Sequence, residues 1–481
     1  MVKVIAPEEL LYESINLTKV FFIGEKVVFE DEADITVTVQ KSDEIITVEL
    51  KDGIHIEADS ESVRQSEYLC APDLDLALGR AFYRAGMRFT GRKPLWGILT
   101  GVRPAKLFMG LTSESSREKA EQVFIDDYYV SEKKTRLCAL VGDNRTKSGA
   151  VSKNDECSLY ISIPYCPSRC AYCSFVSQDN DHYDQKQIEQ YLKLLHLEIK
   201  QTCAYIKNAG QRIITIYVGG GTPAILSPVQ LSELTETLVQ NAPGYHELTV
   251  ELGRPDAITA EKLSALHNIC NARISINPQT MHDPVLERIG RKHTVKQFYR
   301  AYENAVKAGF TDINVDLIAG LPGDTEDGFI ESVMGIQALS PANITIHSYA
   351  KKRGSKLAQE GGADELIQSG TVEHGLDHCA HILLNRDYSP YYLYRQRDIS
   401  GGGENVGWCK EDSFGLYNIY MMDELHSIYG CGAGSVTKAV RAQNDLIRFF
   451  NQRLPLEYIK HFDEMCVKKK EFIEREAVRK Q

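Results

Sequence analysis

The chain has 481 residues, a formal net charge of −11 and 43% hydrophobic residues. Its length exceeds one ordinary domain core and predicts two or more domains. The acidic balance argues against a nucleic-acid partner bound through a basic surface. No apolar run approaches the ~20 residues that cross a bilayer, so we expect no membrane span and a cytoplasmic location. The twelve cysteines are scattered apart from one cluster, which favours reduced thiols and a cofactor over disulfides.

Residues 1–150 are predicted to form a separate α+β domain, whose role the sequence does not indicate. Residues 34–60 alternate apolar and polar side chains between two turn-like breaks, which is typical of an antiparallel meander. Helical stretches are expected near 71–90 and 115–140. The polar, turn-rich segment 142–157 is interpreted as a linker.

Residues 158–350 alternate six strand patterns with helical stretches, which predicts an α/β fold with a parallel sheet. Three strands carry polar side chains on one face and apolar side chains on the other. A doubly wound sheet is apolar on both faces and a filled barrel is mostly apolar inside, so neither fits well. We therefore expect an incompletely closed barrel with a wet, ligand-filled interior. The polar stripes consist of Glu247, Thr249, Glu251, Arg273, Ser275, Asn277, Gln279, Asn314 and Asp316.

The last part of the chain, residues 351–481, mixes several patterns. A helical stretch is expected near 369–386 and a strand over 391–396. A glycine-rich segment follows over 400–408, and the chain closes with a charged helical tail.

Three cysteines, Cys166, Cys170 and Cys173, follow the first strand of the α/β region with C-x3-C-x2-C spacing. The carboxyl ends of strands are where α/β active sites collect, which argues against chance clustering. A structural zinc site takes four ligands, and the nearest fourth candidate is His182. A four-iron cluster held by three thiolates instead leaves one iron without a protein ligand, and this interpretation fits three cysteines best.

This spacing, with an aromatic residue before the third cysteine, resembles the signature of the radical S-adenosylmethionine (SAM) superfamily. The resemblance implies a partial (β/α)6 barrel and a [4Fe-4S] cluster held by the three cysteines, whose open iron is chelated by SAM. An electron from the cluster then cleaves SAM to a 5′-deoxyadenosyl radical. The cluster also implies oxygen sensitivity and anaerobic or microaerobic use.

Further motifs match positions that contact SAM in this superfamily. The three consecutive glycines of "GGGTP" (219–223) let backbone groups approach a ligand closely. The superfamily places the SAM amino group there, its ribose at the carboxylate that ends the third strand, and its adenine at "IAGLPGDT" (318–325). The cofactor-binding residues implied are Gly220, Gly221, Thr222, Glu251, Gln279, Arg291, Asp316, Ile318 and Ala319.

The motifs "YISIPYC", "GGGTP", "INPQT", "NVDLIAGLPG" and "GCGAGS" resemble the oxygen-independent coproporphyrinogen III oxidase-like group over residues 158 to about 440. "TGRKPLWGILTGVRP", "YYLYRQ" and "ENVGW" resemble its HemZ branch. The resemblance implies a coproporphyrinogen dehydrogenase of haem biosynthesis, which decarboxylates two propionates of its tetrapyrrole substrate to vinyl groups and yields protoporphyrinogen IX. Residues 351–481 would then form a HemN-like region that covers the substrate.

The same resemblance implies one or two bound SAM molecules, the second beside Tyr160, Gln279 and Asp316. Arg395 and Arg397 are candidates for binding substrate propionates. A reductant such as flavodoxin or ferredoxin and an electron acceptor are the implied partners.

One position departs from the group's dehydrogenases, which carry a further cysteine where this chain has Phe175. Because that cysteine is not a cluster ligand, we expect cluster assembly to survive, whereas decarboxylation is what the change affects. A radical SAM methylase or haem-degrading enzyme and a haem-binding chaperone remain alternatives. For the chaperone, the candidate haem ligands are His347, His426 and Cys431.

Overall fold

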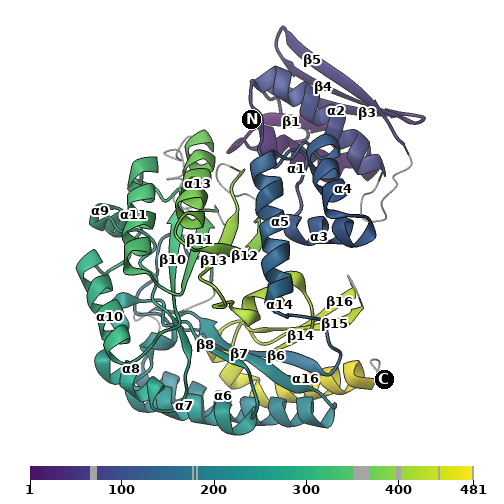
Figure 1. Cartoon of the computed structure of the whole chain (residues 1–481). Coiled ribbons are helices and arrows are strands. Elements are labelled where there is room, and N and C mark those ends of the chain that lie inside the picture. The colour runs from purple at the N-terminus through teal and green to yellow at the C-terminus, as the bar shows by residue number, and fades with distance from the viewer. Residues whose placement is uncertain are drawn as a thin grey trace.

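The computed structural model describes residues 1–64, 73–175, 178–179, 183–350, 355, 369–396, 402–442 and 445–478. The first part of the chain forms a small sheet with helices against it (Figure 1). The strands are β1 (Val2–Ile5), β2 (Val27–Val28), β3 (Ile35–Ser42), β4 (Ile45–Asp52) and β5 (His55–Ser62), in the order β2-β1-β3-β4-β5. The predicted meander is confirmed, because β3, β4 and β5 pair antiparallel.

The helices of this first part are α1 (Glu8–Phe21), α2 (Asp73–Thr90), α3 (Pro104–Glu114), α4 (Arg117–Gln122), the π-helix η1 (Val123–Asp127) and α5 (Glu132–Lys147). The prediction of a single helix near 115–140 is therefore wrong. The helical run breaks at Tyr129, whose φ is 55°. The break is fixed by tertiary hydrogen bonds that the local pattern does not contain, from the Ile98 amide to the Tyr128 carbonyl and from the Ser131 amide to the Leu95 carbonyl.

The predicted linker over 142–157 is also too long, because α5 continues to Lys147 and the next strand starts at Glu156. That strand opens the six-stranded parallel core: β6 (Glu156–Ile163), β7 (Arg212–Gly220), β8 (Glu247–Val250), β9 (Arg273–Ser275), β10 (Ile313–Ala319) and β11 (Asn343–Ser348). Neighbouring strands pair in parallel throughout, as predicted.

Helices connect these strands and cover the outer face of the curved sheet (Figure 1). They are α6 (Gln185–Asn208), the 3-10 helices η2 (Pro223–Ile225) and η3 (Pro255–Ala257), α7 (Pro228–Asn241), α8 (Ala260–His267), α9 (Asp283–Arg288), α10 (Val295–Lys307) and α11 (Glu326–Leu339). Capping boxes start two of them, with Ser227 and Gln230 at α7 and Thr294 and Gln297 at α10.

The last part of the chain extends both edges of the same sheet with β12 (Ser389–Tyr394), β13 (Asn405–Cys409), β14 (Ser427–Cys431), β15 (Val436–Ala442) and β16 (Asp445–Phe450). Among the described residues the strand order is β12-β13-β11-β10-β9-β8-β7-β6-β14-β15-β16, so the sheet stays open. This confirms the partial barrel. The remaining helices are α13 (Ser369–Leu384), α14 (Leu416–Asp423), α15 (Pro455–Lys460) and α16 (Phe462–Val478).

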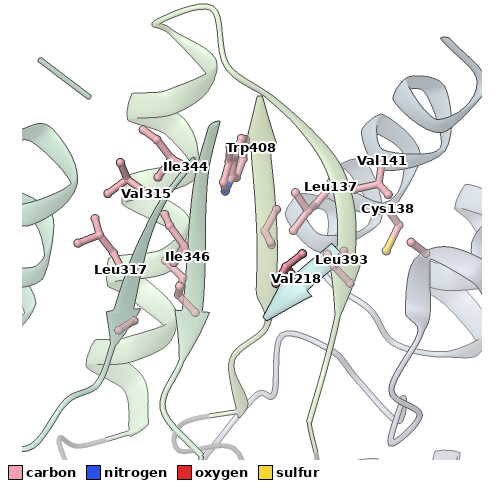
Figure 2. Packing of buried hydrophobic residues seen from close by; sticks show 14 of the residues in the cluster. Leu137, Cys138, Val141, Val218, Val315, Leu317, Ile344, Ile346, Leu393 and Trp408 are labelled. Carbon is pink, nitrogen blue, oxygen red and sulfur yellow. The ribbon is translucent and has the colours of Figure 1, made fainter. Parts of the chain in front are cut away.

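Helix α5 joins the first part of the chain to the sheet. Figure 2 shows Leu137 and Val141 of α5 beside Leu393 of β12, with Trp408 of β13 further along the same buried layer. All four side chains are buried, and full burial of an apolar side chain of this size contributes about 1.5–3 kcal/mol. The two parts of the chain therefore share one hydrophobic core. Among the residues that the structure describes, no helix is long and apolar enough to cross a membrane.

Candidate active site

The three clustered cysteines lie in a loop, Pro164–Phe175, that leaves the carboxyl end of β6. We call it the cysteine loop. Backbone hydrogen bonds anchor it: the Cys166 amide donates to the Gln178 carbonyl at 2.8 Å, and the Ala171 amide donates to the Ile289 carbonyl at 2.9 Å. Cys170 is buried, whereas Cys166 and Cys173 are partly exposed.

This loop forms one wall of a cavity of about 270 Å³ at the carboxyl ends of the parallel strands, here called the cysteine cavity. Most of the site residues predicted from the sequence line it. They are Cys166, Cys170, Cys173, Gly220, Gly221, Glu251, Gln279, Arg291, Asp316 and Ile318. The fold thus brings together residues that are up to 152 positions apart in the chain.

Two guanidinium groups lie next to Cys170. Arg254 Nη1 is 3.7 Å and Arg291 Nη1 is 3.9 Å from the Cys170 sulfur. Arg254 also donates to the Ser168 carbonyl at 3.0 Å, and Arg291 donates to the Gly253 carbonyl at 2.9 Å, so both cations are held in place. A cysteine that binds a metal does so as a negatively charged thiolate, and these two cations are placed to offset that charge.

The glycines after β7 allow the backbone to pass close to the cysteine loop. Gly220 has a φ of 106°, and a Cβ there would lie 3.0 Å from the Ile163 nitrogen. A Cβ on Gly221 would collide with the Tyr165 carbonyl. A side chain at either position would therefore displace backbone atoms, and the Gly221 amide is held to the end of β6 by its hydrogen bond to the Ile163 carbonyl at 2.7 Å.

Glu251 follows β8, and its carboxylate faces the cavity. The Tyr217 hydroxyl donates a hydrogen bond to Glu251 Oε2 at 3.1 Å. Burial, and to a smaller extent the negative charge of Asp316, raises the pKa of Glu251 to about 7. A carboxylate in this state gains from a ligand that donates hydrogen bonds to it, such as a pair of ribose hydroxyls.

Asp316, on β10, is the centre of a polar network on the concave face of the sheet. Its two carboxylate oxygens accept hydrogen bonds from the amides of Asn277 and Asn314, both at 2.7 Å. His347 Nε2 lies 3.7 Å from Asp316 Oδ2. Burial lowers the pKa of His347, but hydrogen bonding and attraction to Asp316 raise it, so the pKa lies above its ordinary value.

Gln279 has a φ of 74°, and its amide donates to the Asp316 carbonyl at 3.1 Å. Its side-chain oxygen is buried and has no hydrogen-bond partner among the described residues. Because a buried acceptor without a donor costs about 1–3 kcal/mol, this atom indicates a ligand with a donor group. Three thiols, two cations and unpaired acceptors in one cavity fit an iron–sulfur cluster with SAM.

Four of the predicted site residues lie away from the lining of this cavity. Tyr160 stacks on Tyr217 with ring centroids 6.2 Å apart. The Thr222 hydroxyl donates to the Leu252 carbonyl at 2.5 Å, and Ala319 is buried within β10. Arg395 lines a different cavity, described below. Arg397 lies outside the described residues, as does His182, the fourth ligand considered for zinc.

No three Cys, His, Asp or Glu side chains gather around a single-ion site in the described parts of the chain. Glu247, the first residue of the predicted polar stripe, is not available to a ligand in the cysteine cavity. Its carboxylate accepts hydrogen bonds from the backbone amides of Leu416 at 2.6 Å and Tyr417 at 3.0 Å, at the start of α14. A carboxylate at a helix N-terminus is stabilised there. Within the predicted stripe, Glu251 therefore faces the cavity, whereas Glu247 holds the start of α14 in place.

Sequence reasoning missed several residues of the lining. No pattern in the sequence indicates Arg254, because the strand pattern ends at Glu251 and only the fold turns the chain back toward Cys170. Asn277 was placed on the polar stripe without a role in the site. Tyr394 and Asn405 come from β12 and β13, whose place beside β11 no local pattern indicates.

The family model for the Radical SAM superfamily matches residues 160–334. The chain is 34% identical to the "Oxygen-independent coproporphyrinogen-III oxidase-like protein HemZ" of Bacillus subtilis over 393 residues, which are 80% of this chain and 78% of that protein. It is also 35% identical to the "Heme chaperone HemW" of the same organism over 237 residues, 46% of this chain and 61% of that protein.

Among solved structures, the coproporphyrinogen III oxidase HemN of Escherichia coli, described as a radical SAM enzyme, matches with a TM-score of 0.52 and 20% identity. The match covers 68% of this chain and 73% of that one. The fold is thus that of a radical SAM protein, which implies a [4Fe-4S] cluster and SAM. Within that superfamily, the chain belongs to the oxygen-independent coproporphyrinogen III oxidase-like group and is HemZ-like.

Proposed function

We propose that this protein is an oxygen-independent coproporphyrinogen III dehydrogenase, a radical SAM oxidoreductase of haem biosynthesis. The observation that carries the proposal is the cysteine cavity itself. One cavity joins three cysteines to the glycine turn, the Glu251 carboxylate and the unpaired oxygen of Gln279. The similarity to HemZ and the HemN-like fold support the choice of a porphyrinogen as substrate.

In this proposal Cys166, Cys170 and Cys173 hold the cluster. The peptide groups of Gly220 and Gly221 bind the SAM amino group, and Glu251 binds the ribose hydroxyls. The bound cluster and SAM supply one-electron reduction and an acceptor for a substrate hydrogen atom. Arg254 and Arg291 place positive charge beside the cluster ligand Cys170, and the walls of the cavity keep water from the reacting carbon.

The overall change at each propionate removes one hydrogen atom from the β-carbon, releases CO2 from the carboxylate and passes one electron to an acceptor, which leaves a vinyl group. Two such steps convert coproporphyrinogen III to protoporphyrinogen IX. Each step therefore needs a reductant for SAM cleavage and a separate electron acceptor. We propose flavodoxin or ferredoxin as the reductant, and the cytoplasm as the location.

Phe175 lies at the cavity where the group's dehydrogenases carry a further cysteine, and its side chain is 65% exposed. An exposed phenylalanine cannot donate a hydrogen atom or a proton as a thiol does. If the proposal holds, the dehydrogenase reaction on this scaffold proceeds without that thiol.

A haem-carrying role is the second candidate, and it is favoured by the similarity to HemW. Of the three candidate haem ligands, only His347 lines the cysteine cavity. His426 is buried, with Nε2 at 2.7 Å from the Ser158 hydroxyl, and Cys431 is buried 3.6 Å from Lys469 Nζ. His347 itself faces Asp316 on one side and Asn405 on the other, at 3.7 and 3.3 Å. These contacts favour the enzyme.

The test uses the full chain, reconstituted without oxygen with iron and sulfide and supplied with SAM, dithionite and coproporphyrinogen III. Mass spectrometry follows 5′-deoxyadenosine, S-adenosylhomocysteine and the tetrapyrrole. We expect loss of one and then two CO2H plus H units, in step with 5′-deoxyadenosine. Cys170→Ala should abolish both, whereas Cys138→Ala, at a buried cysteine outside the cavity, should leave them unchanged.

Other products would point to other members of the superfamily. S-adenosylhomocysteine together with 5′-deoxyadenosine would indicate a methylase. SAM cleavage with an intact tetrapyrrole would overturn the proposed substrate, and stoichiometric haem binding without any turnover would support the haem carrier.

A further inference from the structure

A second cavity, of about 90 Å³, lies where the first part of the chain meets the barrel. We call it the arginine cavity. Two of the three sequence segments that resemble the HemZ branch contribute to it, "TGRKPLWGILTGVRP" through Arg92 and Trp96 and "YYLYRQ" through Arg395 and Gln396. The sequence makes Arg395 of the second segment a candidate for binding a substrate propionate, and the fold brings it next to the first segment over about 300 positions of the chain.

The walls of this cavity carry more positive than negative charge. Three cationic side chains, Lys19, Arg92 and Arg395, line it together with one carboxylate, Glu373. Arg92 Nη2 lies 3.8 Å from Glu373 Oε1, which is too long for a good hydrogen bond. Burial raises the pKa of Glu373 to about 7. Near neutral pH its carboxyl group therefore carries only part of a negative charge to set against the three cations. The cavity is therefore suited to a further anionic group.

Arg395 is held by the first part of the chain and not by an acid. Its Nη1 donates to the Leu99 carbonyl at 2.5 Å, and its guanidinium lies over the Trp96 ring, 5.3 Å from the centroid. Its Nε is buried and has no hydrogen-bond partner among the described residues. Trp96 is fixed in turn by its hydrogen bond to Glu404 at 2.9 Å. Arg395 Nη2 also donates to the Gly402 carbonyl at 3.4 Å. The cation is thus oriented in advance, and its Nε is left for a ligand.

Gln396 connects this cavity with the cysteine cavity, because its side chain lines both. Its Nε2 donates to the Tyr394 hydroxyl at 3.4 Å, and Tyr394 also lines the cysteine cavity. The Oε1 atom of Gln396 is buried without a partner in the part of the chain that the structure describes. The two cavities therefore have Gln396 in common, and Arg92 and Arg395 line the arginine cavity together with it.

We propose that the arginine cavity is a subsite for one carboxylate arm of the substrate, whose reacting part occupies the cysteine cavity. This inference rests on the proposed function and assigns a role to the first part of the chain: it supplies Arg92 and orients Arg395. A volume of about 90 Å³ is several times the ~10–15 Å³ that a cavity needs to hold one water molecule. It admits a short carboxylate side chain and excludes a tetrapyrrole ring.

The test measures binding separately from turnover. Coproporphyrin III, a stable tetracarboxylate, and its tetramethyl ester are titrated against the full chain by porphyrin fluorescence. Arg92→Gln should weaken binding of the acid about tenfold or more, because a charge-assisted hydrogen bond is lost, and should leave binding of the ester unchanged. Arg92→Lys should retain part of the affinity. The matched control is Lys93→Gln, at an exposed neighbouring cation outside the cavity, which should change neither.

Unchanged binding of the acid by Arg92→Gln, or an equal loss for acid and ester, would overturn the subsite. So would the absence of measurable binding of coproporphyrin III to the wild type. If Arg92→Gln does not fold, Lys19→Gln on the exposed face of α1 takes its place, with a severalfold loss expected for the acid alone. A wild type that binds the acid through Arg92 but does not decarboxylate coproporphyrinogen III would retain the subsite and refute the proposed function.

Discussion

Replacing Glu251 by Gln should stabilise the ligand-free protein at neutral and alkaline pH. Its carboxyl has an ordinary pKa of 4.5 and a pKa of about 7 in the folded protein, raised by burial and by Asp316. Between these values the folded state binds more protons than the unfolded state, so the free energy of unfolding falls as pH rises. Below about pH 4.5 both states are protonated and the penalty is absent.

The difference between the two pKa values corresponds to about 3 kcal/mol for a fully buried group. Because Glu251 is partly exposed to the cavity, we expect Glu251→Gln to raise the free energy of unfolding by about 1–3 kcal/mol, with the full effect above pH 7. Glutamine has nearly the same shape, carries no charge to desolvate and still accepts the hydrogen bond from Tyr217. The stabilisation should come with weaker SAM binding, since a carboxylate for the ribose is lost.

The assay is urea unfolding of the wild type and Glu251→Gln at several pH values between 5 and 8.5. The exposed Glu236→Gln on α7 serves as the control and should follow the wild type. The free energy of unfolding of Glu251→Gln should exceed that of the wild type by an amount that grows from pH 5 to pH 7 and then levels off. A difference that is constant with pH, or negative above pH 7, would refute the reasoning.

Two further changes test the scaffold. Lys469→Met should lower the free energy of unfolding by about 3–5 kcal/mol, because Lys469 Nζ lies 2.7 Å from Glu198 Oε1 and each side chain is only 1% exposed. The control Lys468→Met, at an exposed position, should lower it by less than about 0.5 kcal/mol. Similar losses for the two variants in urea unfolding would contradict a stabilising role of the buried ion pair. Gly221→Ala should lower SAM affinity at least tenfold in equilibrium dialysis, because its Cβ would collide with the cysteine loop. Gly110→Ala on α3, where a Cβ meets nothing within 4 Å, should leave SAM affinity unchanged, so an unchanged affinity in both variants would show that the glycine turn does not contact SAM.

Local sequence patterns are sufficient to predict most of the strands and helices. Strands β3, β4 and β5 follow from period-two alternation between turn residues, and strands β6 to β11 follow from short strand patterns that alternate with helical stretches. Both patterns reflect local geometry and need no knowledge of neighbouring strands. The helical run near 115–140 was predicted wrongly because its break at Tyr129 depends on hydrogen bonds from a loop some 30 residues earlier. Nothing local to residues 115–140 records those partners.

The residues of the candidate site also fall into those that local patterns predict and those that depend on distant contacts. Local motifs are sufficient to predict the cysteine cluster, the glycine turn and the carboxylates at strand ends, because parallel strands bring their carboxyl ends to one edge whatever else the fold does. Three other features follow from long-range contacts alone: Arg254 turns back to Cys170, β12 and β13 bring Tyr394 and Asn405 beside β11, and Arg395 lies against Trp96. These contacts join segments far apart in the chain, and their energies depend on burial and packing that exist only after the chain has folded.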